Sequence, residues 1–328
     1  MSRDTCPVCP HACRLRPGEV GICGARQGQV ERVAPLNYGQ CTALALDPIE
    51  KKPLARFYPG TQILSYGSYG CNLGCAFCQN WEIAQVGRAT QAGTARVAEA
   101  RFISPAELVT QAVELEARGN IGIALTYNEP LICPEYIGDV AEAIAARARE
   151  QERNQARSAL LAQKRTRDSV QDKTQAQELL QPEFQPQKQS LKLVLVTNGY
   201  VMPAIAEQVF AVVDAANIDL KAFNQEFYDA VGAPAGLSTA KRSIQIAREA
   251  GCHVEVTTLV IPGLNDSAEE MEREAAWLAS LSPELPLHIS AFRPAYKMRD
   301  TEATSASLVY ELARIAQRHL KYVYPGNV

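Results

Sequence analysis

Residues 65–81 read SYGSYGCNLGCAFCQNW and carry three cysteines on one short loop: Cys71, Cys75 and Cys78. The loop follows directly after residues 62–67, QILSYG, which have the composition and length of a strand. We therefore expect the three thiols at the carboxyl end of this strand, where α/β folds gather their active sites. The stretch predicts an α/β fold with a thiolate site at one edge of its sheet.

The spacing Cys-x3-Cys-x2-Cys supplies three ligands and no fourth beside them. Thiolates suit iron–sulfur clusters, and a cluster of four irons normally takes four protein ligands. Three thiolates would therefore leave one iron open for a cofactor. Gly70 and Gly74 permit a tight backbone around a cluster. Phe77 and Trp81 can shield it from water. Two alternatives stay open: a zinc site with a remote fourth ligand, and a buried group of inert cysteines.

From residue 61 onward, short β-rich runs alternate with helical patterns. We expect strands at 62–67, 121–127, 191–197, 216–221, 253–260 and 286–292. We expect helices near 104–118, 134–150, 203–213, 238–250, 266–281 and 305–319. Ser104 with Glu107 forms a capping-box signature, and Pro105 suits the first helical position. Six β-then-α units imply parallel strands with right-handed crossovers, in an open sheet or an incomplete (β/α) barrel.

The chain divides into two parts by composition. Residues 1–60 are rich in Cys, Gly and Pro and form a small Cys-rich N-terminal module, whereas residues 61–328 carry the alternating α/β pattern. Residues 151–190 interrupt that pattern as a Gln-rich insertion with many charges and few aromatic residues. Such a composition cannot bury enough apolar area to fold alone. We expect its first half to extend the helix that begins near Pro134, and its second half to be a linker.

Composition and charge limit the possible functions. The chain has 328 residues, 47% of them hydrophobic, ten cysteines and a formal net charge of −3. This near-neutral charge argues against a general nucleic-acid or membrane-surface binder. The first residues lack the apolar core of a signal peptide, and no apolar run is long enough to span a membrane. We expect a cytoplasmic protein, in which clustered cysteines are more often metal ligands or redox groups than disulfides.

The loop CNLGCAFCQN resembles the cluster loop of radical S-adenosylmethionine enzymes, and residues 61–300 follow that family in register. The resemblance implies a partial (β/α)6 barrel and a [4Fe-4S] cluster held by the three loop cysteines. In this superfamily the open iron chelates the amino and carboxylate groups of S-adenosylmethionine. The reduced cluster cleaves the cofactor to methionine and a 5′-deoxyadenosyl radical, which abstracts hydrogen from a substrate. An electron donor such as ferredoxin or flavodoxin is implied as a partner.

Motifs at two further strand ends fit the same resemblance. TYNEP at 126–130 stands where pyruvate formate-lyase activating enzymes carry Gly-Gly-Glu-Pro, with both glycines replaced here. The resemblance implies that Asn128 and Glu129 receive the methionine ammonium, for which a carboxylate is a suitable partner. The alternative is a turn capped by Asn128. In VTNGY at 196–200, Thr197 and Asn198 are implied to hold the ribose or the methionine carboxylate.

Three later motifs also match. In NIDLKAF, Asp219 and Lys221 are two residues apart and would face the same side of a strand, beside a polar ligand or as a structural ion pair. The stretch LVIPGLND resembles the lining of the adenine pocket around Val260, Ile261 and Gly263. In HISAFRP, His288 and Arg293 would reach the cofactor or the substrate. The alternative for His288 is a satisfied core histidine.

The closer resemblance is to the radical enzymes of the AmmeMemoRadiSam system. It rests on CPVCPHAC and GEVGICGAR within 6–26, LDPIEKKPL at 46–54, FYPG at 57–60, TYNEPLI, and AFRPAYKM. The resemblance implies AMMECR-type and Memo-type proteins as partners. Where members commonly carry Tyr-His after Lys-Lys-Pro-Leu, this chain has Ala55 and Arg56, so a substrate contact there would differ.

A second group of cysteines lies in the N-terminal module: Cys6, Cys9, Cys13 and Cys23. Four thiolates complete a tetrahedral zinc site or close a second iron–sulfur cluster, and they leave no open position. We expect a structural or electron-relaying metal site there, the alternative being free thiols. Cys41 is a possible substitute ligand, whereas Cys133 and Cys252 are expected in the core.

Three functions remain for comparison. The first is a radical S-adenosylmethionine enzyme with an unidentified substrate. The second is an activase that removes hydrogen from a glycine of a partner protein. The third is a non-enzymatic zinc module that binds RNA or protein. Metal analysis separates the third from the others, because it requires zinc and no iron.

Overall fold

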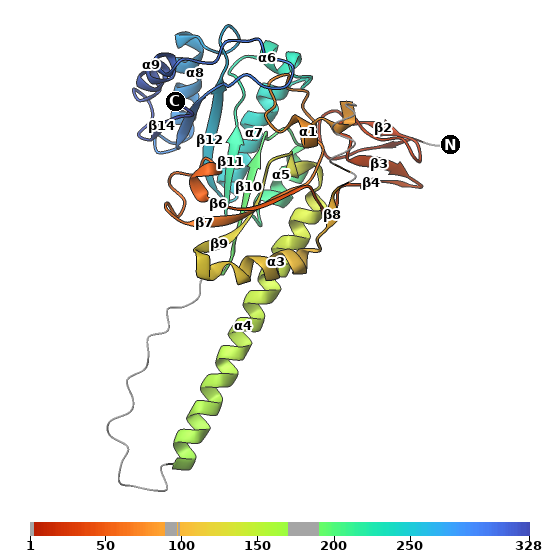
Figure 1. Cartoon of the computed structure of the whole chain (residues 1–328), viewed down its shortest axis with the longest axis vertical. Coiled ribbons are helices and arrows are strands. Elements are labelled where there is room, and N and C mark those ends of the chain that lie inside the picture. Colours follow the sequence, from red (N-terminus) through yellow and green to blue (C-terminus); the bar gives the residue numbers. More distant parts are fainter. Residues whose placement is uncertain (1–2, 89–96, 98, 170–189) are drawn as a thin grey trace.

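The computed structural model describes residues 3–88, 97, 99–169 and 190–328 (Figure 1). Its main sheet has eight strands in the order β14-β13-β12-β11-β10-β9-β7-β6. The strands are β6 Ala43–Pro48, β7 Gln62–Gly67, β9 Asn120–Leu125, β10 Lys192–Thr197, β11 Ala215–Asp219, β12 His253–Val260, β13 Leu287–Ala291 and β14 Val323–Gly326. Neighbouring strands are parallel except for β6 and β7, which form an antiparallel pair. The α/β fold with a mostly parallel sheet confirms the expected class.

All six expected strands are present, and two edge strands were not expected. β6 lies within the Cys-rich residues 1–60 and pairs with β7 over its full length. β14 carries Pro325 and pairs in parallel with β13. Pro is tolerated on an edge strand because no further ladder has to be formed on its outer side. The expected strand 216–221 ends at Asp219, so Lys221 lies beyond it.

The helices follow the strands as the pattern predicted. The described helices of six or more residues are α3 Pro105–Glu114, α4 Pro134–Ser169, α5 Pro203–Phe210, α6 Gln225–Ala230, α7 Gly236–Glu249, α8 Ala268–Leu281 and α9 Ala306–Ala316. The short helices are α1 Trp81–Ala84, η1 Ile49–Lys51, η2 Val86–Arg88, η3 Glu116–Arg118 and η4 Pro130–Ile132. The Ser104 side chain accepts the backbone N–H of Glu107 at 3.2 Å, which confirms the predicted N-cap of α3. α6 was missed, although Asn224 caps it.

α4 extends well past the expected helix and projects away from the sheet (Figure 1). The first half of the Gln-rich insertion is therefore helical, because it is rich in good helix formers. The linker expected in its second half falls mainly on 170–189, which lie outside the described residues. No helix in the described part of the chain is both long enough and apolar enough to cross a membrane.

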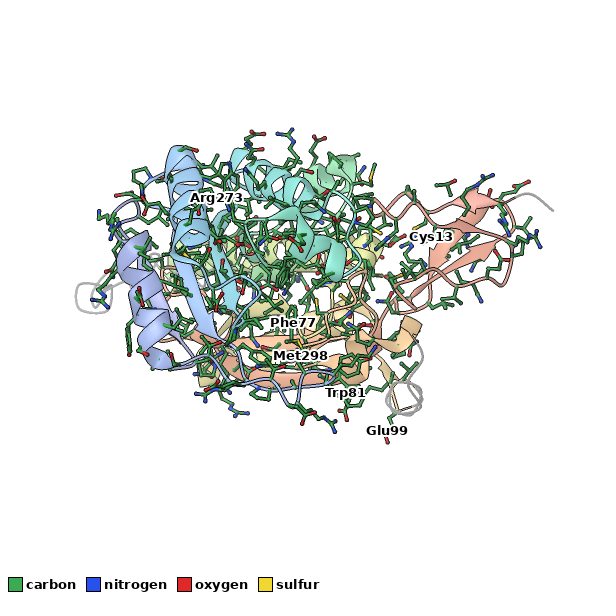
Figure 2. The ribbon with its side chains drawn as sticks, turned by 90° about the horizontal axis from the view of Figure 1, so that it is seen from above. Cys13, Phe77, Trp81, Glu99, Arg273 and Met298 are labelled. Atoms are coloured by element: carbon green, nitrogen blue, oxygen red, sulfur yellow. The ribbon has the colours of Figure 1, made fainter. Side chains whose placement is uncertain are left out.

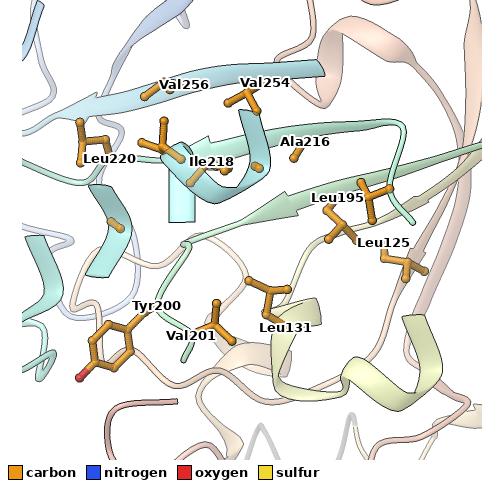
Figure 3. Close-up of a cluster of buried hydrophobic side chains, with 14 of the residues drawn as sticks. Leu125, Leu131, Leu195, Tyr200, Val201, Ala216, Ile218, Leu220, Val254 and Val256 are labelled. Carbon is orange, nitrogen blue, oxygen red and sulfur yellow. The ribbon is translucent and has the colours of Figure 1, made fainter. Parts of the chain in front are cut away.

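Side chains that alternate along the strands give the sheet one face packed against helices and one face that borders a cavity. On the packed face, side chains such as Leu125, Leu195 and Ile218 form a buried apolar cluster beneath the helices (Figure 3). The neighbouring residues in sequence, among them Thr126, Val196 and Asp219, line a cavity on the opposite face. Because successive strand residues point to opposite faces, the same strands provide both the core and a polar interior.

The N-terminal region adds short antiparallel pairs beside the main sheet. They are β1 Asp4–Thr5 with β2 Arg14–Leu15, β3 Arg26–Gln29 with β4 Arg32–Pro35, and β5 Gln40–Cys41 with β8 Arg101–Phe102. Figure 2 shows Cys13 among these strands, to the side of the barrel. The side chain of Arg26 is almost fully buried and binds Glu135 of α4 at 2.8 Å, which ties this region to the main domain.

Residues 49–57, which we call the floor segment, cross the amino-terminal side of the sheet between β6 and β7. Pro48 lies opposite Gln62, the first residue of β7, so the segment starts at that end of the parallel strands. The carboxylate of Glu255 in β12 accepts the backbone N–H groups of Ala55 at 3.0 Å and Arg56 at 2.7 Å. Ile49, Leu54 and Phe57 form an apolar cluster with inward side chains of β7, β9, β10 and β11. The floor segment thus closes one end of the barrel.

Candidate functional site

A cavity of about 760 Å³ occupies the interior of the sheet. Its walls include Lys52 beside β6 and Tyr324 on β14, which stand at opposite edges of the sheet. Both edges can line one cavity only if the sheet is curled, as in a partial barrel. The three cysteines of the 65–81 loop line this cavity together with Glu129, Asp219 and Lys221.

The cysteine loop is fixed from several sides. The backbone N–H of Leu73 donates to Cys71 Sγ at 3.4 Å, and Asn198 Nδ2 lies 3.7 Å from the same sulfur. Gly74 N–H donates to the carbonyl of Val231 at 2.8 Å. Gly70 has φ +88°, and a Cβ there would lie 2.7 Å from the carbonyl oxygen of Cys23. Glycine is therefore required at 70 both for its backbone conformation and for the close approach of another chain segment.

Aromatic residues cover the loop. Phe77 is buried and packs against Phe227 with ring centroids 5.8 Å apart. Trp81 stacks on Tyr296 with centroids 5.0 Å apart, and the backbone N–H of Lys297 donates to the carbonyl of Ala76 at 2.9 Å. Figure 2 shows Phe77, Met298 and Trp81 in this part of the molecule. The segment around Lys297 therefore lies against the cysteine loop and restricts the access of water.

The electrostatics of the loop suit a cationic metal centre. Burial raises the pKa of the Cys71 thiol well above its usual range, and the negative charges of Glu129 and Cys75 raise it further. Thiolates so close together and so buried need positive charge to stay ionised. Iron supplies it, and soft thiolate ligands are those that iron–sulfur clusters use. The donor set thus fits such a cluster.

No three His, Cys, Asp or Glu side chains in the described part of the chain are arranged to hold a metal ion. Ligands of a single zinc ion all lie about 2.0–2.3 Å from one centre and therefore crowd together. Ligands of a cubane cluster bind different irons and lie farther apart. The assignment of a cluster is therefore supported by the chemistry of the three thiols as ligands. It is not supported by a compact arrangement around a single ion.

Glu129 occupies a central position in the cavity wall and is almost fully buried. Its carboxylate accepts Thr197 Oγ1 at 2.6 Å, Asn198 N–H at 2.8 Å and Leu131 N–H at 3.0 Å. Burial raises the pKa of Glu129 to about 7 despite these three hydrogen bonds, which favour the charged form. A cation in the cavity would find a rigidly held acceptor here.

The other residues predicted at these two strand ends bind the protein itself. Asn128 lines the cavity, but its amide accepts Ser68 N–H at 2.9 Å and donates to the carbonyls of Tyr69 and Gly70 at 3.2 Å. It therefore anchors the start of the cysteine loop. Asn198 donates to Asn72 Oδ1 at 2.9 Å and accepts Tyr200 N–H at 2.8 Å. Thr197 and Asn198 also donate to Glu129, a contact that the sequence motifs did not predict, and their predicted contact with the ribose or the methionine carboxylate stays a prediction.

Asp219 and Lys221 form an ion pair with a 2.6 Å separation. Burial alone would lower the pKa of Lys221, but Asp219 and the neighbouring Cys75 and Cys78 outweigh it and raise that pKa. Lys221 therefore remains an ammonium beside two of the three thiols. The structure has the ion pair, and both side chains also line the cavity, whereas their contact with a polar ligand stays a prediction.

The stretch expected to line the adenine pocket is not part of the wall described for the cysteine-loop cavity, and its contact with adenine stays a prediction. Val260 and Ile261 are fully buried, and their side chains are not among the residues described as lining the cavity. Gly263 has φ +76°, and its N–H donates to Asp266 Oδ2 at 2.9 Å. Arg293 donates to the carbonyl of Asn327 at 2.9 Å. Any contact of this stretch with a cofactor would have to come from its backbone.

His288 does line the cavity, and its Nε2 lies 2.6 Å from Glu255 Oε2. Glu255 also approaches His253 Nε2 at 2.9 Å, in addition to its two bonds to the floor segment. Sequence reasoning missed Glu255 because all but one of these partners lie far away along the chain. It also gave no role to Lys52, Asp47 and Tyr127, although LDPIEKKPL and TYNEP contain them.

The four N-terminal cysteines lie together around Gly21 and Ile132. Burial raises the pKa of Cys9 to about 12, with smaller contributions from Cys23, Cys6 and Cys13. The N–H of Cys71 donates to the carbonyl of Cys23 at 3.2 Å, so the two cysteine groups are in direct backbone contact. Cys41 lies apart in β5, and Cys133 and Cys252 are buried in the main core as expected.

Comparison with known proteins agrees with this geometry. Residues 65–275 match the model of the radical SAM superfamily. The chain is 32% identical over 327 residues to the uncharacterized protein MJ0808 of Methanocaldococcus jannaschii, covering 98% of this chain and 81% of the relative.

Solved structures with a similar fold include the following two. One is a radical SAM methyltransferase from Sphaerobacter thermophilus, with 15% identity, 82% of this chain and 67% of that chain covered, and a TM-score of 0.50. The other is a domain of pyruvate-formate lyase-activating enzyme from Bacteroides vulgatus, with 17% identity, 42% and 82% coverage, and a TM-score of 0.36. The methyltransferase likeness shows the fold alone. From the family match, which spans residues 65–275, the chain belongs to the radical SAM superfamily, whose members are enzymes that use S-adenosylmethionine and an iron–sulfur cluster.

Proposed function

We propose that this protein reductively cleaves S-adenosylmethionine with a [4Fe-4S] cluster held by the three loop cysteines and uses the resulting radical to abstract hydrogen from a substrate. The observation that carries the proposal is that Cys71, Cys75 and Cys78 line one curled-sheet cavity together with Glu129. When bound, the cluster and cofactor supply the electron and the 5′-deoxyadenosyl radical. The protein's part is to bind, orient and exclude water.

Several residues of the cavity wall, and others around the cysteine loop, contribute to that part. The three thiolates hold the cluster, and the Lys221 ammonium offsets part of their negative charge. Glu129 accepts the ammonium of the cofactor, since its carboxylate is held in place by Thr197 and Asn198. Phe77 and Trp81, with the segment around Lys297, limit the access of water to the loop. Asn128 acts as a positioning residue that keeps the start of the loop in place.

The finer assignment is also a proposal. The motifs support a radical enzyme of the AmmeMemoRadiSam branch, with AMMECR-type and Memo-type proteins as partners and ferredoxin or flavodoxin as the electron donor. The alternative within enzymes is an activase that forms a glycyl radical on a partner protein. A glycyl radical on a co-purified partner would distinguish it. Membership of an enzyme superfamily argues against a non-enzymatic zinc module as the function of the chain.

We further propose a second metal site at Cys6, Cys9, Cys13 and Cys23, which binds zinc or a second iron–sulfur cluster. Its support is that the four thiols line one small cavity and that Cys23 contacts Cys71 through the backbone; the described side chains would have to close further around a single zinc ion. Four thiolate ligands leave no open position, so the site would be structural or would pass electrons to the first cluster.

The test is spectroscopic. Protein reconstituted anaerobically with iron and sulfide and then reduced should give a cluster signal in electron paramagnetic resonance that changes when S-adenosylmethionine is added. Serine variants at each of the three loop cysteines should lose the cofactor-responsive signal. Cys252→Ser, a matched change at a buried core cysteine, should keep it. A cofactor-responsive signal that survives in Cys71→Ser would refute the assignment.

A further inference from the structure

A buried lysine stands in the cavity wall beside the floor segment. The Lys52 side chain is only 2% exposed, yet it lines the same cavity as the cysteine loop. Its Nζ lies 2.9 Å from Asp47 Oδ2 and 4.7 Å from the centre of the Tyr127 ring. Burying an ammonium is costly unless the charge is well paired. Burial indeed lowers the pKa of Lys52, although Asp47 opposes the shift.

The pairing of this ammonium is incomplete. An ammonium has three N–H donors. Within the described residues, the one hydrogen-bond acceptor that Lys52 Nζ contacts is the Asp47 carboxylate. Asp47 also accepts Tyr127 OH at 2.6 Å and lies 3.4 Å from Lys51 Nζ, so two ammonium groups share one carboxylate. Glu50 also lines the cavity, but its carboxylate accepts Gly60 N–H at 2.6 Å.

The ammonium is held on a rigid support. Glu255 fixes the backbone of Ala55 and Arg56, and Asn217 Nδ2 donates to the carbonyl of Pro53 at 2.9 Å. These bonds come from two central strands and leave little freedom for the segment that carries Lys52. A preorganised donor in a concave site binds a ligand without the cost of ordering it.

The backbone that carries Lys52 lies at the amino-terminal end of the strands, whereas its Nζ reaches the Tyr127 ring, which follows the carboxyl end of β9. The cysteine loop and Glu129 follow the carboxyl ends of β7 and β9, whereas the floor segment begins opposite the first residue of β7. A molecule held at Lys52 would therefore lie between the floor segment and the cysteine loop. That is the side of the cavity left for a substrate when the cofactor is bound at the loop.

We propose that Lys52 binds an oxyanion of the substrate, a carboxylate or a phosphate, and so anchors the substrate in the cavity. This inference rests on the proposed function for the identity of the molecule, but not for the existence of the anion site. Asp47 and Tyr127 act as positioning residues that hold the ammonium toward the cavity. Lys51 also borders the cavity and has the same carboxylate partner, but its side chain is 66% exposed, so it serves as the solvent-accessible comparison.

Competitive acetylation of the wild-type chain tests the site without any variant. Lys52 and Lys51 are labelled with acetic anhydride and quantified by peptide mass spectrometry, with Lys51 as the internal control. Inorganic phosphate or malonate, at constant ionic strength, should slow the labelling of Lys52 at least tenfold and that of Lys51 less than twofold. Protection by only one of the two anions identifies the group. Equal effects on both lysines, or none on Lys52, would overturn the proposal.

A second measurement uses variants. The protective anion should raise the thermal midpoint of the wild type and of Lys51→Met, but not that of Lys52→Met, because a ligand stabilises only the protein that binds it. An equal rise in Lys52→Met would place the anion elsewhere and overturn the proposal. Neither measurement requires S-adenosylmethionine cleavage. Cleavage without anion protection would reject the site alone, and anion protection without cleavage would reject the proposed function alone.

Discussion

Replacing Glu255 by glutamine should destabilise the protein strongly, because one fully buried carboxylate joins the floor segment to the barrel. The side chain is 0% exposed and has four partners: two backbone N–H groups and two histidine rings. Glutamine keeps the shape but offers one oxygen, and its NH2 group would face other donors. The hydrogen bonds from His253, His288 and the two amides outweigh the effect of burial and lower the pKa of Glu255 from 4.5 to about 2.

The pKa gives the magnitude and the pH window. A carboxyl whose pKa is lower in the folded state adds stability above its unfolded pKa, and this stability is lost as the pH falls through the folded value. The difference between the unfolded and folded pKa values of Glu255 contributes about 3 kcal/mol to the free energy of unfolding at pH 7 and about 1 kcal/mol at pH 3. Glu255→Gln should therefore lose about 2–3 kcal/mol at pH 7. At pH 3 its deficit relative to the wild type should shrink to about 1 kcal/mol or less.

Urea unfolding followed by circular dichroism measures the stability of both proteins at each pH. Metal-free protein is used, so that the release of iron in acid does not affect the result. Glu284→Gln is the control, because Glu284 forms an exposed ion pair with Lys321, and its replacement should change the stability little. A Glu255→Gln loss no larger than the control's, or one independent of pH between 7 and 3, would refute the role of this carboxylate.

Three further changes test other parts of the molecule. Glu129→Gln should weaken S-adenosylmethionine binding by about one to two decades, since a charged hydrogen bond is worth about 1.5–3 kcal/mol. Glu142→Gln, at an exposed position of α4, should leave the affinity unchanged. Titration calorimetry measures both affinities, and an unchanged affinity in Glu129→Gln would contradict the role of Glu129. A variant without the three loop cysteines should retain bound zinc, or iron with sulfide, until Cys6 and Cys9 are also replaced; a folded but metal-free protein in elemental analysis would reject the second site. Leu54→Ala should lower the free energy of unfolding in urea by about 2–5 kcal/mol, because Leu54 is fully buried in the apolar cluster of the floor segment. A decrease below about 1 kcal/mol would show that this cluster is not tightly packed.

The sequence predicted what depends on local pattern. The cysteine spacing, the six central strands and the Ser104 cap all arise from residues close together in the chain, and the structure has each of these elements. β6 and β14 were missed although both pair with the sheet, because β6 lies in a Gly- and Pro-rich region and β14 has only four residues and contains Pro325. Their pairing partners, not their own composition, make them strands.

The floor of the cavity could not be predicted for a different reason. The bond between Glu255 and Ala55 joins residues 200 positions apart, and that between Asn217 and Pro53 joins residues 164 apart. A charged residue within an apolar strand indicates that it has a partner, because a buried charge needs one. The sequence does not indicate which segment of the chain supplies that partner. Asn128 shows the converse: its motif was recognised, whereas its bonds to Tyr69 and Gly70 became visible only in the fold.

The most direct test of the central claim is the cleavage of S-adenosylmethionine. Protein reconstituted anaerobically and reduced with dithionite should convert the cofactor slowly to equal amounts of 5′-deoxyadenosine and methionine, quantified by liquid chromatography and mass spectrometry. Cys71→Ala should abolish the reaction, because a lost thiolate leaves the cluster too weakly held. Absence of 5′-deoxyadenosine from wild-type protein that contains the cluster, or undiminished formation by Cys71→Ala, would contradict the account.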